Sequence, residues 1–357
     1  MVKLQRLHLE VTNVCNFKCE FCPDAIMGRA RGHMDLGLLQ KILTEIAETE
    51  IAEIVTFHLM GEPLIYPHIF TAITRALDLG IRLHLTTNGS TFALKPDQIR
   101  QLVSLPIPKV TISLQTPDPE TFQIRGAPPH LTPDLYFQGI TDYIHTHLLA
   151  TSPTRVHIKF LDTTPHPFLV PHKRLSVLDN AAVMRAELLS WAKRLLAKLP
   201  EVPSDPWIQQ QLNRYRPGRW QIIALHPRLA LETFPLDSWG NVETARVYPA
   251  SFGTCNGAAQ QAGILYDGTV VPCCKDYEGL IPLGNVREKP LAEILMDQPA
   301  CGLRQGFNHL QVKNPVCQRC IGADSHHKTL LRQLGSIAYF KGYRPLMQKL
   351  QPGWGDV

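Results

Sequence analysis

Nine cysteines are the side chains of this 357-residue sequence with the greatest potential for chemistry. Three of them, Cys15, Cys19 and Cys22, lie in one short run, and the other six follow residue 254. The spacing Cys-x3-Cys-x2-Cys places three thiols on one loop, where they can hold three corners of a 4Fe–4S cube, because cluster iron is ligated by cysteine thiolate. A full protein set would need four ligands, so one iron would stay open to a small molecule.

Two other interpretations of this run are a zinc loop and incidental thiols. Zinc usually takes a fourth Cys or His ligand from the same pattern. His33 is the nearest histidine that follows, and it lies far from the run in the sequence. The spacing therefore favours the cluster.

The later cysteines form two separated pairs, which indicate a second metal site. Cys255 is followed by Gly268 and then by Cys273, and Cys317-Gln-Arg-Cys320 comes later. Zinc is the alternative occupant here. Cys274 and Cys301 remain outside the pairs.

Strand-like and helix-like segments alternate from residue 4 to about residue 163, and this rhythm predicts a parallel sheet with covering helices, either doubly wound or barrel-like. Active sites in both architectures lie at the carboxyl ends of the strands. The expected strands are residues 4–12, 53–61, 82–89, 109–116 and 155–163, with a possible sixth at 230–237. The expected helices are residues 37–48, 68–80, 96–103, 135–149 and 181–199, the last capped by Asp179 or Asn180.

The rest of the chain is irregular. Residues 200–229 are rich in Pro, Arg and Gln and are expected to form an insertion or a linker. Residues 250–323 are short in regular elements and dense in cysteine, which is typical of a small module held together by metal. Residues 328–357 are expected to form a basic, partly helical tail.

Residues 4–163 resemble the radical S-adenosylmethionine (SAM) superfamily, whose signature is the first cysteine spacing with an aromatic residue, here Phe21, before the last cysteine. Residues 58–63 (HLMGEP) are similar to the Gly-Gly-Glu-Pro motif of that family, with Met60 in place of one glycine. The resemblance implies that Gly61, Glu62 and Pro63 grip the SAM methionine. It further implies SAM contacts for Thr87, Asn88, Ser113 and Gln115, at the ends of the third and fourth strands.

The later pattern, Cys-x12-Gly-x4-Cys followed by Cys-x2-Cys, resembles the Twitch module, a shortened SPASM domain, and its spacing is close to that of 2-deoxy-scyllo-inosamine dehydrogenase-like enzymes. This resemblance implies one auxiliary 4Fe–4S cluster on Cys255, Cys273, Cys317 and Cys320. A hairpin turning at Asp267-Gly268 is expected to support it. The implied architecture is a partial (β/α)6 TIM-like barrel over residues 1–240 with an insertion at about 164–229, a Twitch/SPASM-like module over 241–325, and a helical tail over 326–357.

The resemblance implies an enzyme that cleaves SAM to a 5′-deoxyadenosyl radical, which abstracts hydrogen from an unactivated C–H bond. Net oxidation through the auxiliary cluster is the favoured outcome. Epimerisation, with Cys274 or Cys301 returning a hydrogen atom, and peptide cross-linking are alternatives, as is a non-catalytic electron carrier. The two spare cysteines would otherwise be small buried apolar side chains. Arg125 would grip an anion of substrate or SAM, or lie on the surface, and Asp276 and Tyr277 are weaker candidates for a base.

Composition limits the partners. Charged residues make up 19% of the chain and the net charge is +5 without dense basic runs, so no nucleic-acid partner is expected. No apolar stretch approaches the ~20 residues of a membrane span, and with no signal peptide a cytoplasmic protein is expected. The first strand starts at residue 4, leaving no room for a peptide-recognition domain before it, which favours a small polar substrate over a peptide. An external one-electron donor of the flavodoxin or ferredoxin type completes the expected partners.

Overall fold

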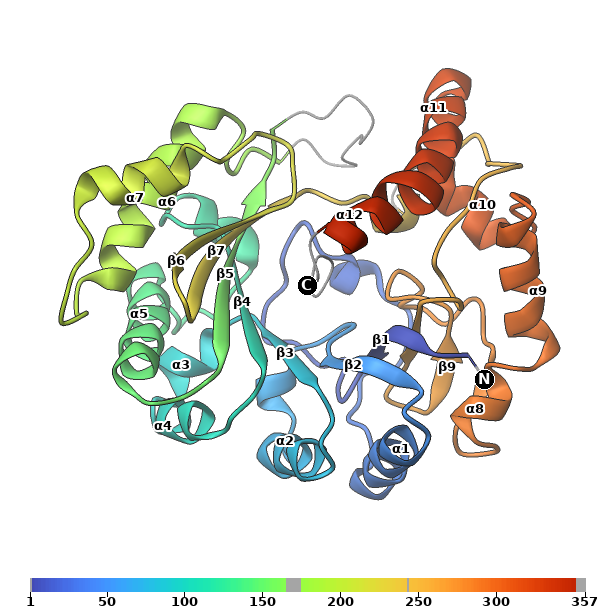
Figure 1. The fold of residues 1–357 in the computed structure, drawn as a ribbon, viewed down its shortest axis with the longest axis horizontal. Helices are drawn as coiled ribbons and strands as arrows, with labels where there is room; N and C mark the ends of the chain where they lie inside the picture. Colours follow the sequence, from blue (N-terminus) through green and yellow to red (C-terminus); the bar gives the residue numbers. More distant parts are fainter. Residues whose placement is uncertain (1, 165–174, 243, 351–357) are drawn as a thin grey trace.

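The computed structural model describes residues 2–164, 175–242 and 244–350, and its strands form one sheet in the order β10-β9-β8-β1-β2-β3-β4-β5-β7-β6 (Figure 1). Six neighbouring strands run parallel and curve into the partial (β/α)6 barrel that was expected. They are β1 (Leu4–Leu9), β2 (Ala52–Phe57), β3 (Leu83–Thr87), β4 (Lys109–Gln115), β5 (Arg155–Asp162) and β7 (Leu229–Pro235).

Alternate side chains of these strands point to opposite faces of the sheet. The outer face is apolar and fully buried, for example at Leu7, Val55, Leu85, Ile112 and Ile158. Amphipathic helices cover this face, as Figure 1 shows. They are α1 (Leu36–Thr49), α2 (Ile69–Asp78), α3 (Ser90–Leu94), α4 (Asp97–Ser104), α5 (Pro133–Leu149) and α6 (Ala181–Leu196).

Helices α1, α5 and α6 begin at side chains that satisfy their first backbone N–H groups. The Asp35 carboxylate accepts from the Leu38 N–H at 2.9 Å at the start of α1. The Asn180 side chain accepts from the Ala182 and Val183 N–H groups at the start of α6, so Asn180 rather than Asp179 is the cap. The chain also contains short 3-10 or π-helical segments. They are η1 (Pro23–Ile26), η2 (Pro63–Ile65), η3 (Thr121–Arg125), η4 (Trp239–Asn241) and η5 (Ala338–Tyr343).

The expectation of a linker over residues 200–229 was wrong. This segment contains α7 (Asp205–Leu212) and the edge strand β6 (Gln221–His226), which pairs antiparallel with β7. Burial alternates along β6, where Ile223 and Leu225 are buried and Ile222 is exposed. The two buried residues give too short a pattern to stand out among the surrounding Pro, Arg and Gln. Residues 165–174 of the expected insertion lie outside the described residues.

The C-terminal module continues the same sheet. Strand β8 (Gln261–Ile264) lies parallel to β1, and β9 (Thr269–Val271) and β10 (Gly284–Asn285) follow antiparallel. The predicted hairpin turns at Gly268, whose φ is +94°, a conformation that favours glycine. Helices α8 (Leu291–Ile294), α9 (Gln298–Asn308), α10 (Pro315–Ile321), α11 (His326–Ile337) and α12 (Arg344–Leu350) complete the chain.

The tail is helical from α11 to α12, and its last seven residues, 351–357, lie outside the described residues. No helix in the described part of the chain is long and apolar enough to span a membrane.

Candidate functional site

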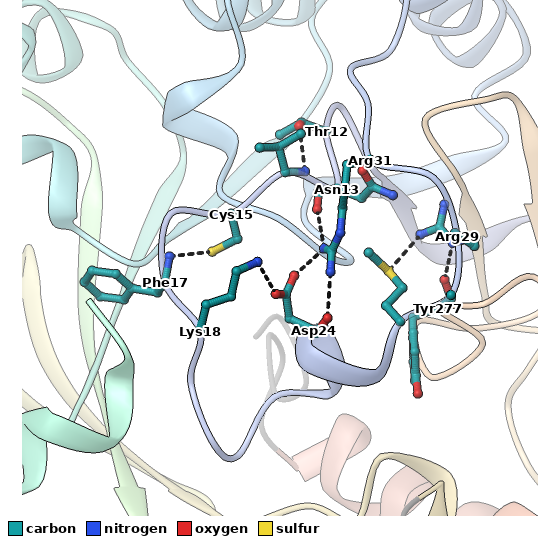
Figure 2. A network of polar contacts seen from close by, with 12 residues as sticks. Thr12, Asn13, Cys15, Phe17, Lys18, Asp24, Arg29, Arg31 and Tyr277 are labelled. Atoms are coloured by element: carbon teal, nitrogen blue, oxygen red, sulfur yellow. Dashed lines mark hydrogen bonds and ion pairs between the residues drawn. The ribbon is translucent and has the colours of Figure 1, made fainter. Parts of the chain in front are cut away.

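The first three cysteines lie on the loop between β1 and α1, which folds back on itself through polar contacts (Figure 2). Thr12 Oγ1 donates to the Gly32 carbonyl at 3.1 Å, and Asn13 bonds to the backbone of Ala30 and Gly32. The buried Asp24 carboxylate accepts from Lys18 Nζ at 2.7 Å and from Arg31. These contacts fix the loop before any cofactor binds.

The cavity enclosed by this loop has a volume of about 140 Å³ and gathers the residues that the motifs singled out. It lies at the carboxyl ends of the parallel strands, as expected for a βα architecture. Among its lining residues are Cys15, Cys19, Cys22, Phe21, Gly61, Glu62, Thr87, Asn88, Ser113, Gln115 and Arg125. Pro63 does not line it; this residue is buried at the first position of η2.

At Gly61, the backbone that follows β2 packs closely against the backbone of the cysteine loop. Its φ is +77°, and a Cβ there would lie 2.4 Å from the Thr12 carbonyl oxygen. The next residue donates its backbone N–H to the Val14 carbonyl at 2.9 Å, so the motif after β2 is tied to the cysteine loop. Only glycine can occupy this position without moving the loop.

Glu62 is buried and accepts hydrogen bonds through both of its carboxylate oxygens. Its Oε1 accepts from Thr87 Oγ1 at 2.7 Å and from the Leu64 N–H at 2.9 Å, and its Oε2 accepts from the Asn88 N–H at 2.5 Å. Burial raises the pKa of Glu62, while these hydrogen bonds and Arg125 act in the opposite direction. The carboxylate thereby joins the ends of β2 and β3.

Arg125 is 1% exposed, which excludes the surface alternative considered for it. Its guanidinium lies 4.7 Å from the centroid of the Phe17 ring and 5.6 Å from that of Phe21. The carbonyl groups of residues 124–126 accept backbone hydrogen bonds from Lys18 and Glu20, so η3 is fastened to the cysteine loop. Burial would lower the pKa of Arg125, but the thiols, led by Cys19, raise it overall.

This donor set fits a 4Fe–4S cube with an open corner. Burial raises the pKa of Cys15 and Cys22 to about 12 and raises that of Cys19, so thiolate formation there requires a cation. Arg125 supplies one positive charge beside the three thiols, and its buried Nε has no hydrogen-bond partner within the described structure. Cluster iron would supply the rest.

A second cavity, about 180 Å³, lies in the C-terminal module and is lined by Cys255, Cys273, Cys317 and Cys320. These are the four cysteines that the spacing grouped together. Burial raises the pKa of Cys255 to about 11 and that of Cys317 to about 12, so this set also needs a metal to be held as thiolates. Four thiols lining one cavity fit a fully ligated 4Fe–4S cube. Within the described residues, no group of three or more His, Cys, Asp or Glu side chains is arranged to hold a single metal ion.

Trp239 lies between the two cavities and lines both. Its indole Nε1 donates to the Phe21 carbonyl at 3.0 Å, and a Cβ added to the following Gly240 would lie 3.4 Å from Cys320 Sγ. Residues 239, 240 and 241 have φ values of +45°, +75° and +62°. This conformation is unfavourable for Trp239, which is not a glycine, and Asn241 stabilises the turn by donating to the carbonyls of Arg319 and Gly322.

Neither of the spare cysteines, Cys274 and Cys301, is among the described residues that line the two cavities. Cys274 lies in a turn after the end of β9, and it packs against a small apolar cluster with Leu59 and Met60. Cys301 is on α9, where its Sγ lies 3.1 Å from the Met296 carbonyl and 3.0 Å from Arg304.

Asp276 and Tyr277 line the second cavity. The Asp276 carboxylate accepts from the Leu280 and Ile281 N–H groups at 2.8 and 2.9 Å, which is a turn-capping role. Tyr277 packs edge-on against Trp239, with ring centroids 6.3 Å apart.

Two family models match this chain: the radical SAM superfamily over residues 9–144 and an iron–sulfur cluster-binding domain, SPASM, over residues 255–321. Residues 9–144 therefore form a radical SAM domain, and residues 255–321 form a SPASM iron–sulfur cluster-binding domain. The cofactors of the chain are accordingly SAM and 4Fe–4S clusters, which the two cysteine-lined cavities fit.

Curated relatives and a solved structure agree with this assignment. The chain is 28% identical over 111 residues to the tungsten-containing aldehyde ferredoxin oxidoreductase cofactor-modifying protein of Pyrococcus furiosus, covering 31% of each. It is 27% identical over 177 residues to the SAM-dependent 2-deoxy-scyllo-inosamine dehydrogenase of Niallia circulans, covering 49% of this chain and 60% of that protein. The matches thus span about a third to three fifths of these relatives. The crystal structure of BtrN with AdoMet and 2-DOIA shares the fold, with a TM-score of 0.52, 17% identity, and coverage of 87% and 89%.

Motif analysis missed Trp239, Asp237 and Lys275, although each lines a cavity of this radical SAM chain. None of them belongs to a cysteine spacing or to the end of an expected βα unit. His58 belongs to the motif over residues 58–63, and its side chain also lines the first cavity, which the motif alone did not indicate.

Proposed function

We propose that this enzyme abstracts hydrogen from an unactivated C–H bond of a small polar substrate and completes a net oxidation, as a dehydrogenase does. The observation that carries the proposal is that Trp239 lines both cysteine-lined cavities, so the SAM site and the auxiliary site would share this side chain as a wall. When bound, the first cluster with SAM supplies a 5′-deoxyadenosyl radical, and the auxiliary cluster supplies an acceptor for one electron.

The residues of the chain orient the reactants and keep out water. Gly61 and Glu62 bring the end of β2 against the cysteine loop, where a SAM methionine group would bind. Ser113 and Gln115 line another part of the cavity, and Gln115 adopts a left-handed φ of +60° at an irregularity in the β4–β5 pairing. Strain of this kind is concentrated at functional sites.

Epimerisation requires a hydrogen donor within reach of the substrate radical. Among the described residues that line the first cavity, neither Cys274 nor Cys301 is present, which supports oxidation over epimerisation. Peptide cross-linking is the other alternative to oxidation. In each case, the electron that starts the reaction would come from an external donor of the flavodoxin or ferredoxin type. Activity assays on metabolites made by the products of neighbouring genes are the direct route to the substrate.

The experiment uses anaerobically reconstituted, reduced enzyme with SAM. We expect slow formation of 5′-deoxyadenosine without substrate, and its loss in a Cys19→Ala variant, because that thiol belongs to the first set. With substrate, a Cys255→Ala or Cys317→Ala variant should still cleave SAM but form no oxidised product. Normal SAM cleavage by Cys19→Ala would refute the assignment of the first loop.

Deuterated water separates oxidation from epimerisation. An oxidase leaves no solvent deuterium at the abstracted carbon, whereas a thiol donor exchanges with solvent and delivers one deuterium. Cys274→Ala and Cys301→Ala should retain product and cost about 1 kcal/mol of stability at most. A singly deuterated product that disappears in either variant would establish the epimerase instead.

A further inference from the structure

The inner face of the sheet below the first cavity is polar. His58, Thr86, Ser113, Leu161 and Phe234 line that cavity. Because side chains two positions apart on a strand share a face, the residues beneath them belong to the same inner surface. These residues are Thr56, His84, Thr111, Lys159 and Glu232, followed by Lys109 and His157, and on β1 by Arg6 and His8.

This surface, called the polar inner face below, differs from the interior of an ordinary (β/α) barrel, which is filled by Val, Ile and Leu. Thr56, His84, Lys109 and Glu232 are all nearly or fully buried. Burying polar groups is unfavourable unless each is paired. Such a face therefore serves either a closed polar network or a polar ligand.

The network is only partly closed. Glu232 accepts from His157 Nδ1 at 3.1 Å, from Lys159 Nζ at 3.1 Å and from Trp220 Nε1 at 3.0 Å. In contrast, the Thr56 hydroxyl has no hydrogen-bond partner among the described residues, and the His8 ring, approached by the Gln261 amide, has no well-formed hydrogen bond. Both side chains are less than a tenth exposed and belong to the polar inner face.

Positive charge predominates on this face. Arg6, Lys109 and Lys159 contribute three cations, and Glu232 is the one carboxylate of the polar inner face as defined above. These cations affect the neighbouring histidines. Besides burial, Arg6 lowers the pKa of His8 and of His58, and Arg6 and Lys109 lower the pKa of His84. The histidines are thereby kept neutral, so that their rings can donate one N–H each without adding charge.

Two contacts connect the polar inner face with the wall of the SAM cavity, and one of its side chains is partly exposed. Lys159 Nζ lies 4.7 Å from the centroid of the Phe234 ring, which lines that cavity. The rings of His8 and His58 are 6.3 Å apart, and His58 also lines it. The Lys159 side chain is 20% exposed.

We propose that the polar inner face binds an oxyanion, a carboxylate or phosphate group, of the substrate and so holds its remaining carbon chain up against the SAM cavity. The substrate class is then a small organic acid or phosphate ester. The inference about the substrate rests on the proposed function, but the oxyanion site itself does not. Lysine and arginine with neutral N–H and O–H donors are the groups that bind such anions.

Thermal unfolding of the reconstituted enzyme tests the site with inorganic phosphate as the probe. Phosphate is varied at constant ionic strength kept with sodium chloride, because simple screening depends on ionic strength alone. A site in the folded state raises Tm with a saturable dependence on phosphate. Lys109→Gln should weaken phosphate binding about tenfold or more. Lys109→Arg, which keeps the charge, should bind as the parent does, and exposed Lys95→Gln is the matched control.

Two outcomes overturn the site: phosphate that stabilises no more than chloride, or equal phosphate binding by the folded parent and Lys109→Gln variant. If Lys109→Gln does not fold, Lys159→Gln takes its place with the same expectation. Glycerol phosphate and malate then test the substrate role, since an organic acid whose chain reaches the SAM cavity should bind more tightly than phosphate itself. Equal or weaker binding of both compounds overturns that role. SAM cleavage in the same samples reports separately on the proposed function.

Discussion

Lys275 Nζ lies 2.8 Å from a carboxylate oxygen of Asp237, and this ion pair joins the walls of the two cavities. Burial would raise the pKa of Asp237, but Lys275 lowers it overall. Burial likewise opposes the charge of Lys275, and Asp237 outweighs it to raise the lysine pKa. Both groups are therefore charged at neutral pH, one from the end of β7 and one from the auxiliary module.

We expect a double-mutant cycle of Asp237→Asn and Lys275→Met to give a coupling free energy of about 1 kcal/mol. The pair is not sealed from water, because the side chains are 26% and 37% exposed, so solvent screening limits the value. Urea unfolding at neutral pH measures it. The surface pair Lys193 and Asp205, 45% and 59% exposed, is the control and should show much weaker coupling. Strict additivity at Asp237 and Lys275 would contradict the prediction.

Substitutions at two glycines can distinguish the cost of a steric clash from the cost of an unfavourable φ. The two positions are Gly61 and Gly80. Both have positive φ, +77° and +71°, but a Cβ at Gly61 would lie 2.4 Å from the Thr12 carbonyl, whereas nothing lies within 4 Å of one at Gly80. Gly80→Ala should cost about 1 kcal/mol of unfolding free energy, the strain alone. Gly61→Ala should cost markedly more and abolish SAM binding, measured by equilibrium dialysis. Similar losses in both variants would show that the approach at Gly61 is not tight.

The motif residues could be predicted because their signals are local. Cysteine spacing identified both thiol sets, and the rule that sites lie at the carboxyl ends of parallel strands brought Glu62, Asn88 and Gln115 to one cavity. The βα alternation likewise predicted the barrel strands, and the Asp267-Gly268 turn within the second cysteine pattern predicted the hairpin.

The missed features depend on contacts between distant segments. Trp239 reaches both cavities only through a left-handed turn that Asn241 stabilises against α10, and no short pattern encodes that turn. The sequence could not decide whether Arg125 lies on the surface or in the site. Its burial follows from packing on Phe17 and from the backbone hydrogen bond that its carbonyl accepts from Lys18. The polar inner face emerges only when the register of six strands is known.

Metal content tests the two thiol sets. Anaerobically reconstituted protein should hold about eight irons and show the broad visible absorption of 4Fe–4S clusters, since each set can hold one cube. Replacing Cys15, Cys19 and Cys22 together with Ala should halve the iron, and the matched change at Cys274 and Cys301 should leave it unchanged. Stoichiometric zinc with no uptake of iron would refute both assignments.

The pH dependence of stability tests the burial of His8. Burial, followed by the nearby His58 and Arg6, lowers the pKa of His8 from 6.5 to about 3. At pH values between these two pKa values, His8 is protonated in the unfolded chain and neutral in the folded chain. The free energy of unfolding must therefore fall as the pH falls through this range. At about pH 5 the loss from this one group is about 2 kcal/mol relative to neutral pH. Urea unfolding of wild type and His8→Leu at about pH 7 and about pH 5 measures the difference, with iron content determined in each sample.

The His8→Leu variant should lose less stability on acidification than wild type, whatever its stability at neutral pH. His130→Gln, at an exposed position, should follow wild type. His58, whose pKa is lowered to about 4 by burial and by Lys159 and Arg6, contributes in the same direction and keeps part of the pH dependence in the variant. Parallel losses in wild type and His8→Leu would mean that His8 is not held neutral, and the cations of the polar inner face would then act on it more weakly than the structure indicates.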